Sequence, residues 1–551
     1  MTRLVVVGNG MVGSRFVEDL LAADTSGRYD VTVVGEEACE PYNRVLLSEV
    51  VAGKHDLAAL TLPTPTSPRL TVLRGQPAAH LDREDRVVVT SDGRRLRYDR
   101  LVLATGSAAR VPPLDGLRSR DQQHGHDRHR GGDHLTAGVH ALRTIDDARE
   151  VVAATLNARR AVVLGGGVLG MEAACGLARR GVVVTVVHPA STLMERQLDA
   201  AAGRVVELAM ARLGIDQRVG VGATSAVVEG GHLTGLRLDD GELVPADLLV
   251  LATGTVPSTS LAAGAGLTVD RGVVVDDDLR SPDDHRVFAI GDCAQPPEGG
   301  TGLVAQGWEQ SRRLAAHLCR ESVASASASF GSSHSSSPGV AANGSTARPL
   351  STGRAPRSST SGSDVVRLKA HGLDVVTMGV CGSDRADDPA QRTLRLSDPD
   401  VGRHVEVVVS GGRLVGATCV GAGAVAADLV TTYTRRTPVP ADPAYLLLPA
   451  LAPHPAAGPT SPADLADDTT VCRCNGVTKA DIAASVHGGA TSAADIATAT
   501  RATTGCGGCR DDVCALLDWL TPASSPDGAG TGENHVTKGK HMIHSTETAG
   551  S

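Results

Sequence analysis

Short, nearly continuous apolar runs recur along the first 320 residues and alternate with segments that have the periodicity of amphipathic helices. Strands of a parallel sheet give such runs because helices cover both faces of the sheet. The helical segments include GSRFVEDLLAAD (13–24) and LGMEAACGLARR (169–180). The pattern therefore predicts an α/β fold with parallel sheets. The predicted strands are RLVVVG (3–8), DVTVVG (30–35), RLVLATG (100–106), AVVLGGG (161–167), VVVTVV (182–187), DLLVLATG (247–254) and RVFAIGD (286–292).

The chain after about residue 360 has a different pattern. HVEVVVSGGRLVGATCVG (404–421) predicts a hairpin with a Gly-Gly turn, and a helical segment follows it. We therefore expect a separate, small α/β unit over 364–455.

Three polar stretches lack the apolar residues that could offset the entropy of ordering, so we expect them to be mobile. They are 119–138, rich in His, Arg and Gly; 321–363, dominated by Ser, Ala, Gly and Pro; and the segment after about 521. The histidines of the first stretch have irregular spacing and no accompanying cysteine or carboxylate pattern. This favours a solvated loop over a metal site.

A glycine-rich turn joins the first predicted strand to the first predicted helix. Gly8, Gly10 and Gly13 fit a tight turn, a close approach of a pyrophosphate, and close packing of helix on strand. The helix N-terminus would offer N–H donors to the phosphates. Glu36 follows the next strand, where a carboxylate can accept both ribose hydroxyls. An ordinary glycine turn does not explain this acidic residue, so we expect a dinucleotide site.

A second copy of this turn contains Gly165, Gly167 and Gly170. His188 stands at the end of the following strand, where the first copy has its acid. A histidine would not repel a 2′-phosphate, so NADPH is expected to be accepted beside NADH; the alternative is a merely polar strand end. Two turns imply two dinucleotides, and a flavin with a nicotinamide is the economical pair because hydride transfer needs the two rings stacked.

Four cysteines near the end of the chain form a C-x-C and a C-x2-C pair: Cys472, Cys474, Cys506 and Cys509. Four thiolates suit tetrahedral zinc or an iron–sulfur cluster, and the C-x-C spacing favours iron. Capping boxes at Thr478 and Ser492 predict two helices between the pairs. A third predicted helix begins just after Cys509 and aims its backbone donors at an anionic cluster.

Composition narrows the function classes. A length of 551 residues predicts about three to five domains of roughly 100–200 residues each. The formal net charge of −9 argues against binding to nucleic acid or to an acidic membrane surface. We find no signal-peptide pattern and no run of 18 apolar residues. Eleven cysteines without a secretory signal point to a reducing compartment, so we expect a cytoplasmic location.

The segments LVLATGS (101–107), LVLATGT (249–255) and VFAIGDCA (287–294) resemble landmarks of the two-dinucleotide flavoprotein disulfide reductase fold. EEACEPYNRVLLS (36–48) is similar to the flavin-contacting segment of ferredoxin and rubredoxin reductases. The resemblance implies FAD, with Asp292 at the flavin ribitol. Those ferredoxin reductases carry a lysine where this chain has Glu49, which leaves the lysine–glutamate pairing of Glu172 open. The further cofactor-binding residues that it implies are Arg44, Ser48, Thr105, Gly106, Gly254 and Gly291.

No C-x4-C follows the first helix, so a dithiol relay of the glutathione-reductase kind is not expected. Cys39 alone fits a packed cysteine better than a peroxidase-like thiol. Electrons must therefore leave the flavin in another way.

The cysteine segment resembles the bacterioferritin-associated ferredoxin-like [2Fe–2S] domain. GNGMVGSRFVEDLL (8–21), LMERQLD (193–199) and TTGCGGC (503–509) are similar to the N-terminal half of the NAD(P)H-dependent nitrite reductase large subunit. This resemblance implies that residues 1–115 and 253–320 bind FAD and that residues 139–252 bind NAD(P)H. A Ser-rich linker, 321–363, would then lead to a small α/β reductase C-terminal domain, 364–455, that covers the flavin. A [2Fe–2S] domain, 468–520, and a tail, 521–551, would follow.

Nitrite reductases of this kind continue into a sirohaem and [4Fe–4S] module, whereas no cysteine follows Cys514 here. The chain is in this respect similar to the electron-transfer subunits of assimilatory nitrate reductases. We therefore expect an NAD(P)H-dependent FAD and [2Fe–2S] oxidoreductase that delivers electrons to a separate nitrate reductase catalytic subunit, or to a nitrite reductase. A stand-alone NAD(P)H oxidase or ferredoxin (rubredoxin) reductase, and a zinc-stabilised redox sensor, remain alternatives.

Overall fold

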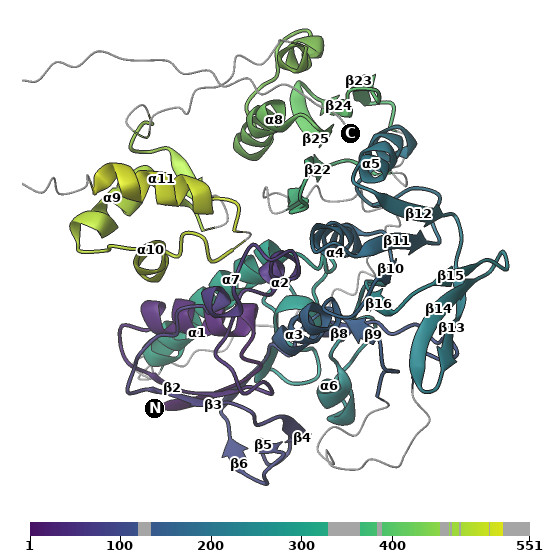
Figure 1. Ribbon diagram of the computed structural model, residues 1–551. Coiled ribbons are helices and arrows are strands. Elements are labelled where there is room, and N and C mark those ends of the chain that lie inside the picture. Colours follow the sequence, from purple (N-terminus) through teal and green to yellow (C-terminus); the bar gives the residue numbers. More distant parts are fainter. Residues whose placement is uncertain are drawn as a thin grey trace, which may run out of the picture.

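The computed structural model describes residues 1–118, 134–328, 364–382, 388–451, 462, 465–472, 475–505 and 507–521. Within these ranges the chain forms two parallel sheets with their helices, a small antiparallel α/β unit and a small helical unit (Figure 1). The stretch 119–133, most of the Ser-rich segment and nearly all of the tail lie outside the described residues.

The first parallel sheet has the order β19-β7-β1-β2-β3. Its strands pair in parallel, as the continuous apolar runs predict. Helix α1 (Met11–Ala23) follows the central strand and packs beside the long helix α7 (Val304–Ala328). The strands are β19 (Val287–Ala289), β7 (Arg100–Leu103), β1 (Thr2–Val7), β2 (Tyr29–Val34) and β3 (Leu70–Leu73).

The second parallel sheet has the order β12-β11-β10-β16-β9 and repeats this architecture. Its strands are β12 (Ile215–Val219), β11 (Val183–His188), β10 (Arg160–Leu164), β16 (Leu248–Leu251) and β9 (Val139–Ala141). Its helices are α3 (Ile145–Ala154), α4 (Val168–Arg179) and α5 (Ala200–Arg212), and α2 (Leu47–Val51) of the first unit packs on α3 and α4.

Several antiparallel elements were not anticipated from the sequence. β4 (Ala78–Asp82), β5 (Val87–Thr90) and β6 (Arg95–Arg97) form one ribbon, and β13 (Ala223–Glu229), β14 (His232–Leu238) and β15 (Leu243–Pro245) form another. β8 (Ser107–Ala109) pairs with β17 (Thr255–Pro257) in the antiparallel sense. The short strands β18 (Val273–Val274) and β20 (Ala294–Gln295) were also not anticipated, and they pair in parallel. The short helix α6 (Ser260–Gly264) follows β17.

Helix α7 corrects one expected boundary. The linker was predicted to begin at residue 321, but the helix continues to Ala328. Alanine is a strong helix former, so the Ala and Ser residues at the start of this segment extend the preceding helix at little cost.

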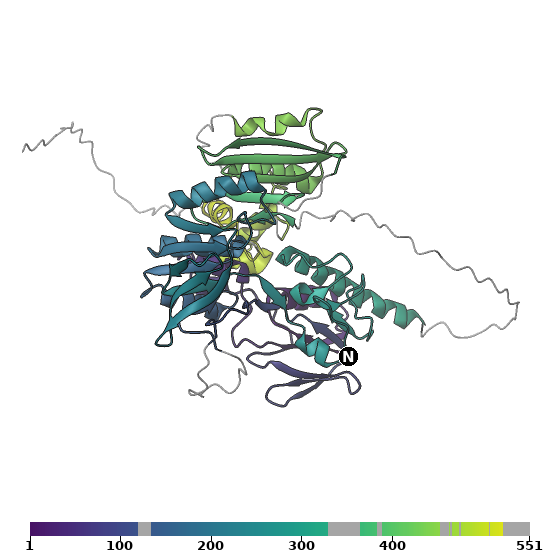
Figure 2. The same cartoon turned by 90° about the vertical axis from the view of Figure 1, so that its right-hand side faces the viewer.

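The small α/β unit contains the predicted hairpin. β24 (Arg403–Ser410) and β25 (Arg413–Val420) pair across the Gly-Gly turn, and α8 (Gly423–Arg435) follows. The sheet order is β21-β22-β25-β24-β23, with β21 (Val366–Arg367), β22 (Val375–Gly379) and β23 (Gln391–Asp398). Viewed from the side in Figure 2, this unit caps the second parallel-sheet unit, where its sheet contacts α5.

The helical unit begins with a short ribbon of β26 (Thr470–Cys472) and β27 (Val477–Thr478). Three helices follow: α9 (Lys479–His487), α10 (Ala493–Thr500) and α11 (Arg510–Leu520). Both predicted capping boxes are present, because Thr478 and Ser492 each exchange hydrogen bonds with the aspartate three residues on. In Figure 1 this unit lies beside α1, and Arg501 at the end of α10 contacts Glu18 of α1.

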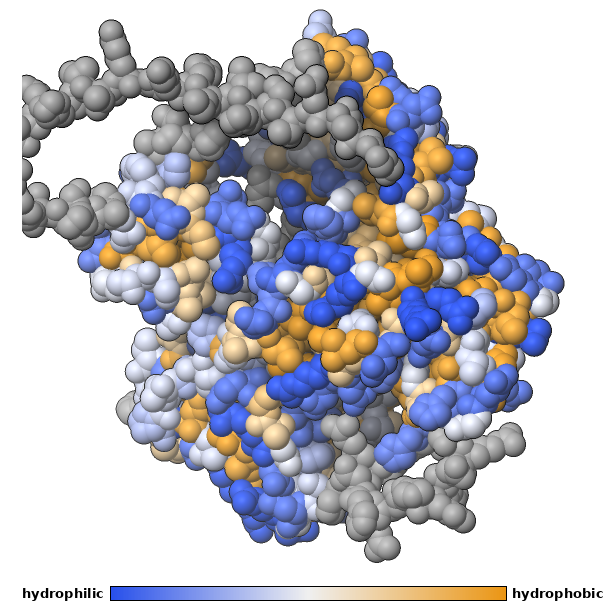
Figure 3. Space-filling view, viewed as in Figure 1, coloured by the Kyte–Doolittle hydropathy of each residue, from blue (hydrophilic) through white to orange (hydrophobic). Residues whose placement is uncertain are grey.

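The face shown in Figure 3 is a mosaic of hydrophilic and hydrophobic residues without a continuous apolar belt. Within the described ranges, no helix has both the length and the apolar character that a membrane crossing requires.

Candidate functional site

The first glycine turn has the geometry of a phosphate cradle. Gly8 has a φ of +118°, and a Cβ there would lie 2.1 Å from the carbonyl oxygen of Ala104. A Cβ on Gly13 would lie 2.1 Å from the carbonyl oxygen of Gly8, so only glycine lets α1 approach the turn. Gly10 is the N-cap of α1 and no side chain caps this end. The helix N–H groups are therefore free to face an anion.

The second turn repeats this geometry. Gly165 has a φ of +116°, and a Cβ on Gly170 would lie 1.9 Å from the carbonyl oxygen of Gly165. Gly167 is the N-cap of α4, and a Cβ there would meet no described atom within 4 Å. This open side is where a pyrophosphate could approach.

Arg44 lies beside the first cradle. A Cβ on Gly10 would lie 3.9 Å from its Nε. The Arg44 guanidinium forms an ion pair with Glu37 and lies over the ring of Tyr42, whose hydroxyl donates to Glu37 at 2.8 Å. Glu36 is exposed just beyond the end of β2. Sequence reasoning singled out Glu36 but missed Glu37, although the two are adjacent.

Asp292 lies in the 3-10 turn Gly291–Cys293, at the carboxyl end of β19. Its Oδ2 accepts hydrogen bonds from Ser107 Oγ at 2.8 Å and from Arg143 Nη2 at 2.7 Å. Arg143 comes from the segment between β9 and α3, so it joins the two parallel-sheet units. Arg143 could not be predicted, because a lone arginine before a helix belongs to no sequence motif.

The ATG segments of the two units meet nearby. Thr105 Oγ1 donates to the carbonyl oxygen of Ser258 at 2.6 Å. Gly106 and Gly254 have φ values of +69° and +96°, and a Cβ on either would meet no described atom within 4 Å. They flank the β8–β17 pair, which joins the units in an antiparallel register.

Glu172 on α4 is only 4% exposed. It contacts α2 of the first unit and the small α/β unit. Its Oε2 accepts a hydrogen bond from Ser48 Oγ at 2.5 Å, and its Oε1 lies 3.0 Å from Lys369 Nζ. The backbone N–H of Lys369 also donates to Oε1, at 2.9 Å. Ferredoxin reductases have a lysine at the position of Glu49. In this chain the lysine that pairs with Glu172 is instead Lys369, which belongs to the small α/β unit. The small α/β unit thus contacts α4 through Lys369, and its sheet contacts α5.

The surroundings of His188 differ from those expected. The end of β11 was expected to lack a carboxylate, but His188 Nε2 lies 2.9 Å from Glu195 Oε2. Glu195 belongs to the LMERQLD segment and reaches back across seven residues. A carboxylate thus stands at this strand end after all, through a loop contact that strand periodicity does not show.

Cys39 is half-buried and packs against the core around α2 and α4. Burial, followed by the charge of Glu37, raises the pKa of its thiol. A thiol with a raised pKa is a poor nucleophile, which supports the packing role over a peroxidase-like one.

Two of the four clustered cysteines, Cys474 and Cys506, lie outside the described residues. Cys472 and Cys509 are both buried. A hydrogen bond with Cys509, together with N–H donors of Asn475 and Thr503, lowers the pKa of Cys472 to about 6 although burial opposes this. Such donors stabilise a thiolate, the form that ligates metal. Among the described residues no three metal-binding side chains gather, as expected with two of the four cysteines missing from that set.

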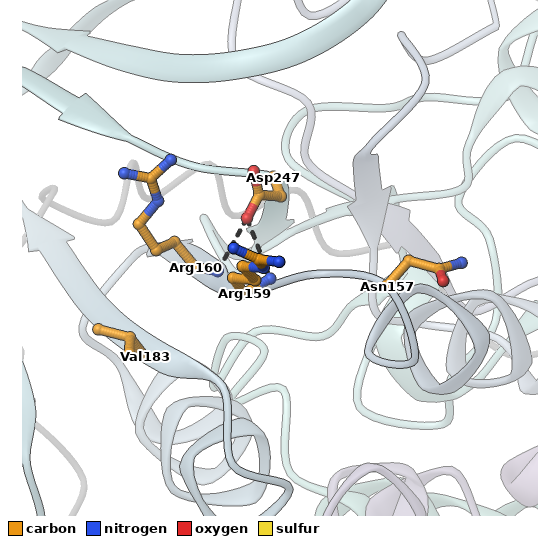
Figure 4. Close-up of a pocket in the computed structure, with 5 residues that line it drawn as sticks. All are labelled: Asn157, Arg159, Arg160, Val183 and Asp247. Atoms are coloured by element: carbon orange, nitrogen blue, oxygen red, sulfur yellow. Dashed lines mark hydrogen bonds between the residues drawn. The ribbon is translucent and has the colours of Figure 1, made fainter.

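A hollow of about 650 Å³ lies elsewhere, lined by Asn157, Arg159, Arg160, Val183 and Asp247 (Figure 4). Asp247 accepts hydrogen bonds from the backbone N–H groups of Arg159 and Arg160, each at 3.0 Å. Arg160 and Val183 are the first residues of β10 and β11. The hollow therefore lies at the amino ends of the strands, away from the glycine turns at the carboxyl ends, where ligands of such sheets bind.

Residues 2–315 match the family model described as pyridine nucleotide-disulphide oxidoreductase. The chain belongs to this family. Residues 470–519, which include all four clustered cysteines, match the BFD-like [2Fe-2S] binding domain. The protein is therefore an FAD-dependent NAD(P)H oxidoreductase with a [2Fe–2S]-binding domain, and the alternative of a zinc-stabilised redox sensor loses its support.

Curated relatives cover nearly the whole chain. It is 31% identical over 94% of its length to a nitrite reductase [NAD(P)H] of Bacillus subtilis (strain 168). It is 28% identical over 95% of its length to an assimilatory nitrate reductase electron transfer subunit of the same strain. The chain spans 57% and 61% of the lengths of these relatives. A crystal structure of the covalent putidaredoxin reductase–putidaredoxin complex shares the fold, with a TM-score of 0.63 at 24% identity over 81% of this chain and 95% of that one.

The described residues fit the cofactors of this family. The indole N–H of Trp308 is buried without a hydrogen-bond partner among the described residues, and Trp308 packs against Met11 and Val45, next to Gly10 and Arg44. The ring Nδ1 of His188 is likewise buried and without a described partner, beside the second turn. Unpaired buried donors and acceptors are rare in proteins, so each cradle has a polar group available for a ligand.

Proposed function

We propose that this chain carries electrons from NAD(P)H through FAD and a [2Fe–2S] cluster to a separate assimilatory nitrate reductase. The residues assigned to each cofactor are those predicted above: the first turn with Glu36, Arg44 and Asp292 for FAD, the second turn with His188 for NAD(P)H, and the four cysteines for the cluster. A cytoplasmic location is part of this proposal.

One observation carries the proposal. Asn43, which precedes Arg44, donates to the carbonyl oxygens of Thr504 at 2.9 Å and Gly505 at 2.5 Å. A Cβ on Gly507 would lie 2.7 Å from the side chain of Leu46. The loop on both sides of Cys506 is therefore seated on the segment that borders the first phosphate cradle, which brings the cysteine site and the flavin unit together.

When bound, FAD supplies hydride acceptance from NAD(P)H and release of single electrons, which the cluster can carry. The chain's own residues position these groups. Gly10 and Gly167 expose two helix N-termini to the pyrophosphates. Arg143 holds Asp292 in place, and Asn43 holds the cysteine loop against the flavin unit.

The partner is inferred from the relatives. The nitrate reductase electron transfer subunit supports a nitrate reductase as acceptor. The nitrite reductase relatives favour a nitrite-reducing module as the second candidate. The two are distinguished by mixing the loaded protein with each purified reductase and measuring NADH-dependent loss of nitrate or of nitrite.

Cys509→Ser tests the electron path. This variant removes a thiolate ligand and is expected to lose the cluster, while NADH-dependent reduction of ferricyanide stays near the wild-type rate and nitrate reduction through the partner is lost. Cys514→Ser, on α11 but outside the four cysteines, is the matched control and should behave as wild type. Partner reduction that persists in the cluster-free Cys509→Ser protein would show that electrons leave directly from the flavin, as in a stand-alone reductase.

A further inference from the structure

The contact between the cysteine unit and the flavin unit continues beyond Asn43, along the outer side of α1. Arg501, at the C-terminus of α10, forms an ion pair with Glu18 of α1. The exposed fractions of these two side chains are 12% and 33%. The pair is partly buried, so separating its partners would leave a partly buried charge without compensation. Such a pair favours one arrangement of the two units over others.

A second ion pair lies next to the first. Arg15 Nε of α1 lies 2.9 Å from Asp19 Oδ1, and the Arg15 guanidinium lies over the ring of Trp308. Burial, followed by the like charge of Arg15, lowers the pKa of Arg501 to about 10. Two arginines and two carboxylates thus form one compact group, to which the flavin unit contributes three members and the cysteine unit one.

A second contact connects this group to a cysteine. Arg15 Nη1 donates to Asn475 Oδ1 at 3.0 Å. The amide nitrogen of Asn475 lies 2.7 Å from the carbonyl oxygen of Arg501 and 3.8 Å from Cys472 Sγ. Asn475 therefore spans the distance from α1 of the flavin unit to a cysteine of the predicted cluster.

The loop that makes these contacts has an unusual backbone. Arg501 and Thr503 have φ values of +64° and +68°, a region that residues other than glycine rarely adopt. Such a backbone persists only where the surroundings hold it. Asn43, Glu18 and Asn475 supply those surroundings, two of them from the flavin unit.

We propose that Glu18, Arg15 and Asn43 form a polar latch that holds the cysteine unit, through Arg501, Asn475 and the 504–505 carbonyls, in the position in which the cluster receives electrons from the flavin. This inference rests on the proposed function and adds the surface and residues that set the internal transfer. The occupant of the surface is the chain's own C-terminal unit.

Charge reversal across the latch tests it in the full-length protein loaded with FAD and cluster. Glu18→Arg and Arg501→Glu should each slow reduction of the cluster by NADH about tenfold or more, since each leaves two like charges in a partly buried interface. Flavin reduction should stay unchanged. The double variant Glu18→Arg/Arg501→Glu restores an opposite pair and should recover cluster reduction. Asp85→Arg, in an exposed ion pair of the same unit, is the control and should have no effect.

Amide hydrogen exchange gives a readout that is independent of electron transfer. Residues 500–505 should exchange faster in each single reversal and return toward wild type in the double variant. Glu18→Gln is a milder variant that should show the same trend if a reversal impairs folding. Single variants with wild-type exchange and wild-type cluster reduction would overturn the latch alone. An intact wild-type cluster that NADH does not reduce would overturn the proposed function, and the latch with it.

Discussion

The imidazole of His188 is held by Glu195 at the end of β11, where nucleotide-binding units of this kind commonly place an acidic residue against the ribose hydroxyls. A histidine alone would accept a 2′-phosphate, whereas a histidine with an adjacent carboxylate repels it. We therefore predict a preference for NADH, in place of the equal acceptance of both coenzymes expected from His188 alone.

Glu195→Gln should raise kcat/KM for NADPH relative to NADH about tenfold, or about 1.4 kcal/mol, because it removes a like charge that opposes the 2′-phosphate. Steady-state kinetics with both nucleotides measure this. Glu207→Gln on α5, whose partner is Arg204, is the control. An unchanged ratio in Glu195→Gln would show that this carboxylate does not face the ribose.

Single residues show what the sequence could and could not predict. Gly8, Gly13, Asp292 and the cysteines stand in local motifs, so they could be named without a structure. Three residues that other parts of the chain bring to the site could not be named: Arg143 beside Asp292, Glu195 beside His188, and Lys369 beside Glu172. Lys369 reaches Glu172 across 197 positions, and this separation is set by tertiary packing and not by any local pattern.

At the scale of elements, two strand–turn–helix units share the same glycine geometry, and we propose that each binds one of the two dinucleotides. A Cβ would clash at Gly13 in one unit and at Gly170 in the other. The assignment of FAD to the first and of NAD(P)H to the second is therefore testable by parallel substitutions.

Gly13→Ala should yield protein with little bound flavin, because α1 must move away from its turn. Gly170→Ala should retain flavin but bind NADH weakly, with KM raised at least about tenfold for the loss of one or two phosphate hydrogen bonds. The ratio of flavin to protein absorbance and the NADH titration separate the two effects. The opposite pattern would reverse the assignment.

Lys369 ties the small α/β unit to α4 and α2. Lys369→Met would leave the carboxylate of Glu172 buried without its cation, and unfolding should become easier by about 3 kcal/mol. Lys369→Met/Glu172→Gln removes the uncompensated charge and should be more stable than Lys369→Met alone. Urea unfolding of the two variants checks this, and equal stabilities would mean that the pair is not coupled.

The elements were predictable where one pattern dominated. Buried parallel strands gave continuous apolar runs, and the capping boxes marked α9 and α10. The ribbons β4–β6 and β13–β15 were missed because half-exposed antiparallel strands such as Arg95–Arg97 carry polar residues on one face. The end of α7 was misplaced because Ser and Ala are compatible with both a linker and a helix.

At the scale of the whole molecule, the chain folds back so that its last unit lies on its first. Asn43, Leu46 and α1 contact the loop around residues 501–507, more than 450 positions away. Nothing in the sequence placed the cysteine unit there. This arrangement gives physical content to the proposed path, because the cysteine site borders the cradle assigned to FAD.

The most direct test is anaerobic mixing of the fully loaded protein with NADH, followed by flavin absorbance and by electron paramagnetic resonance of the cluster. If electrons follow the proposed path, the flavin is reduced first and the signal of a reduced [2Fe–2S] cluster then appears without any added mediator. A flavin that is fully reduced by NADH while an intact cluster stays oxidised would contradict it.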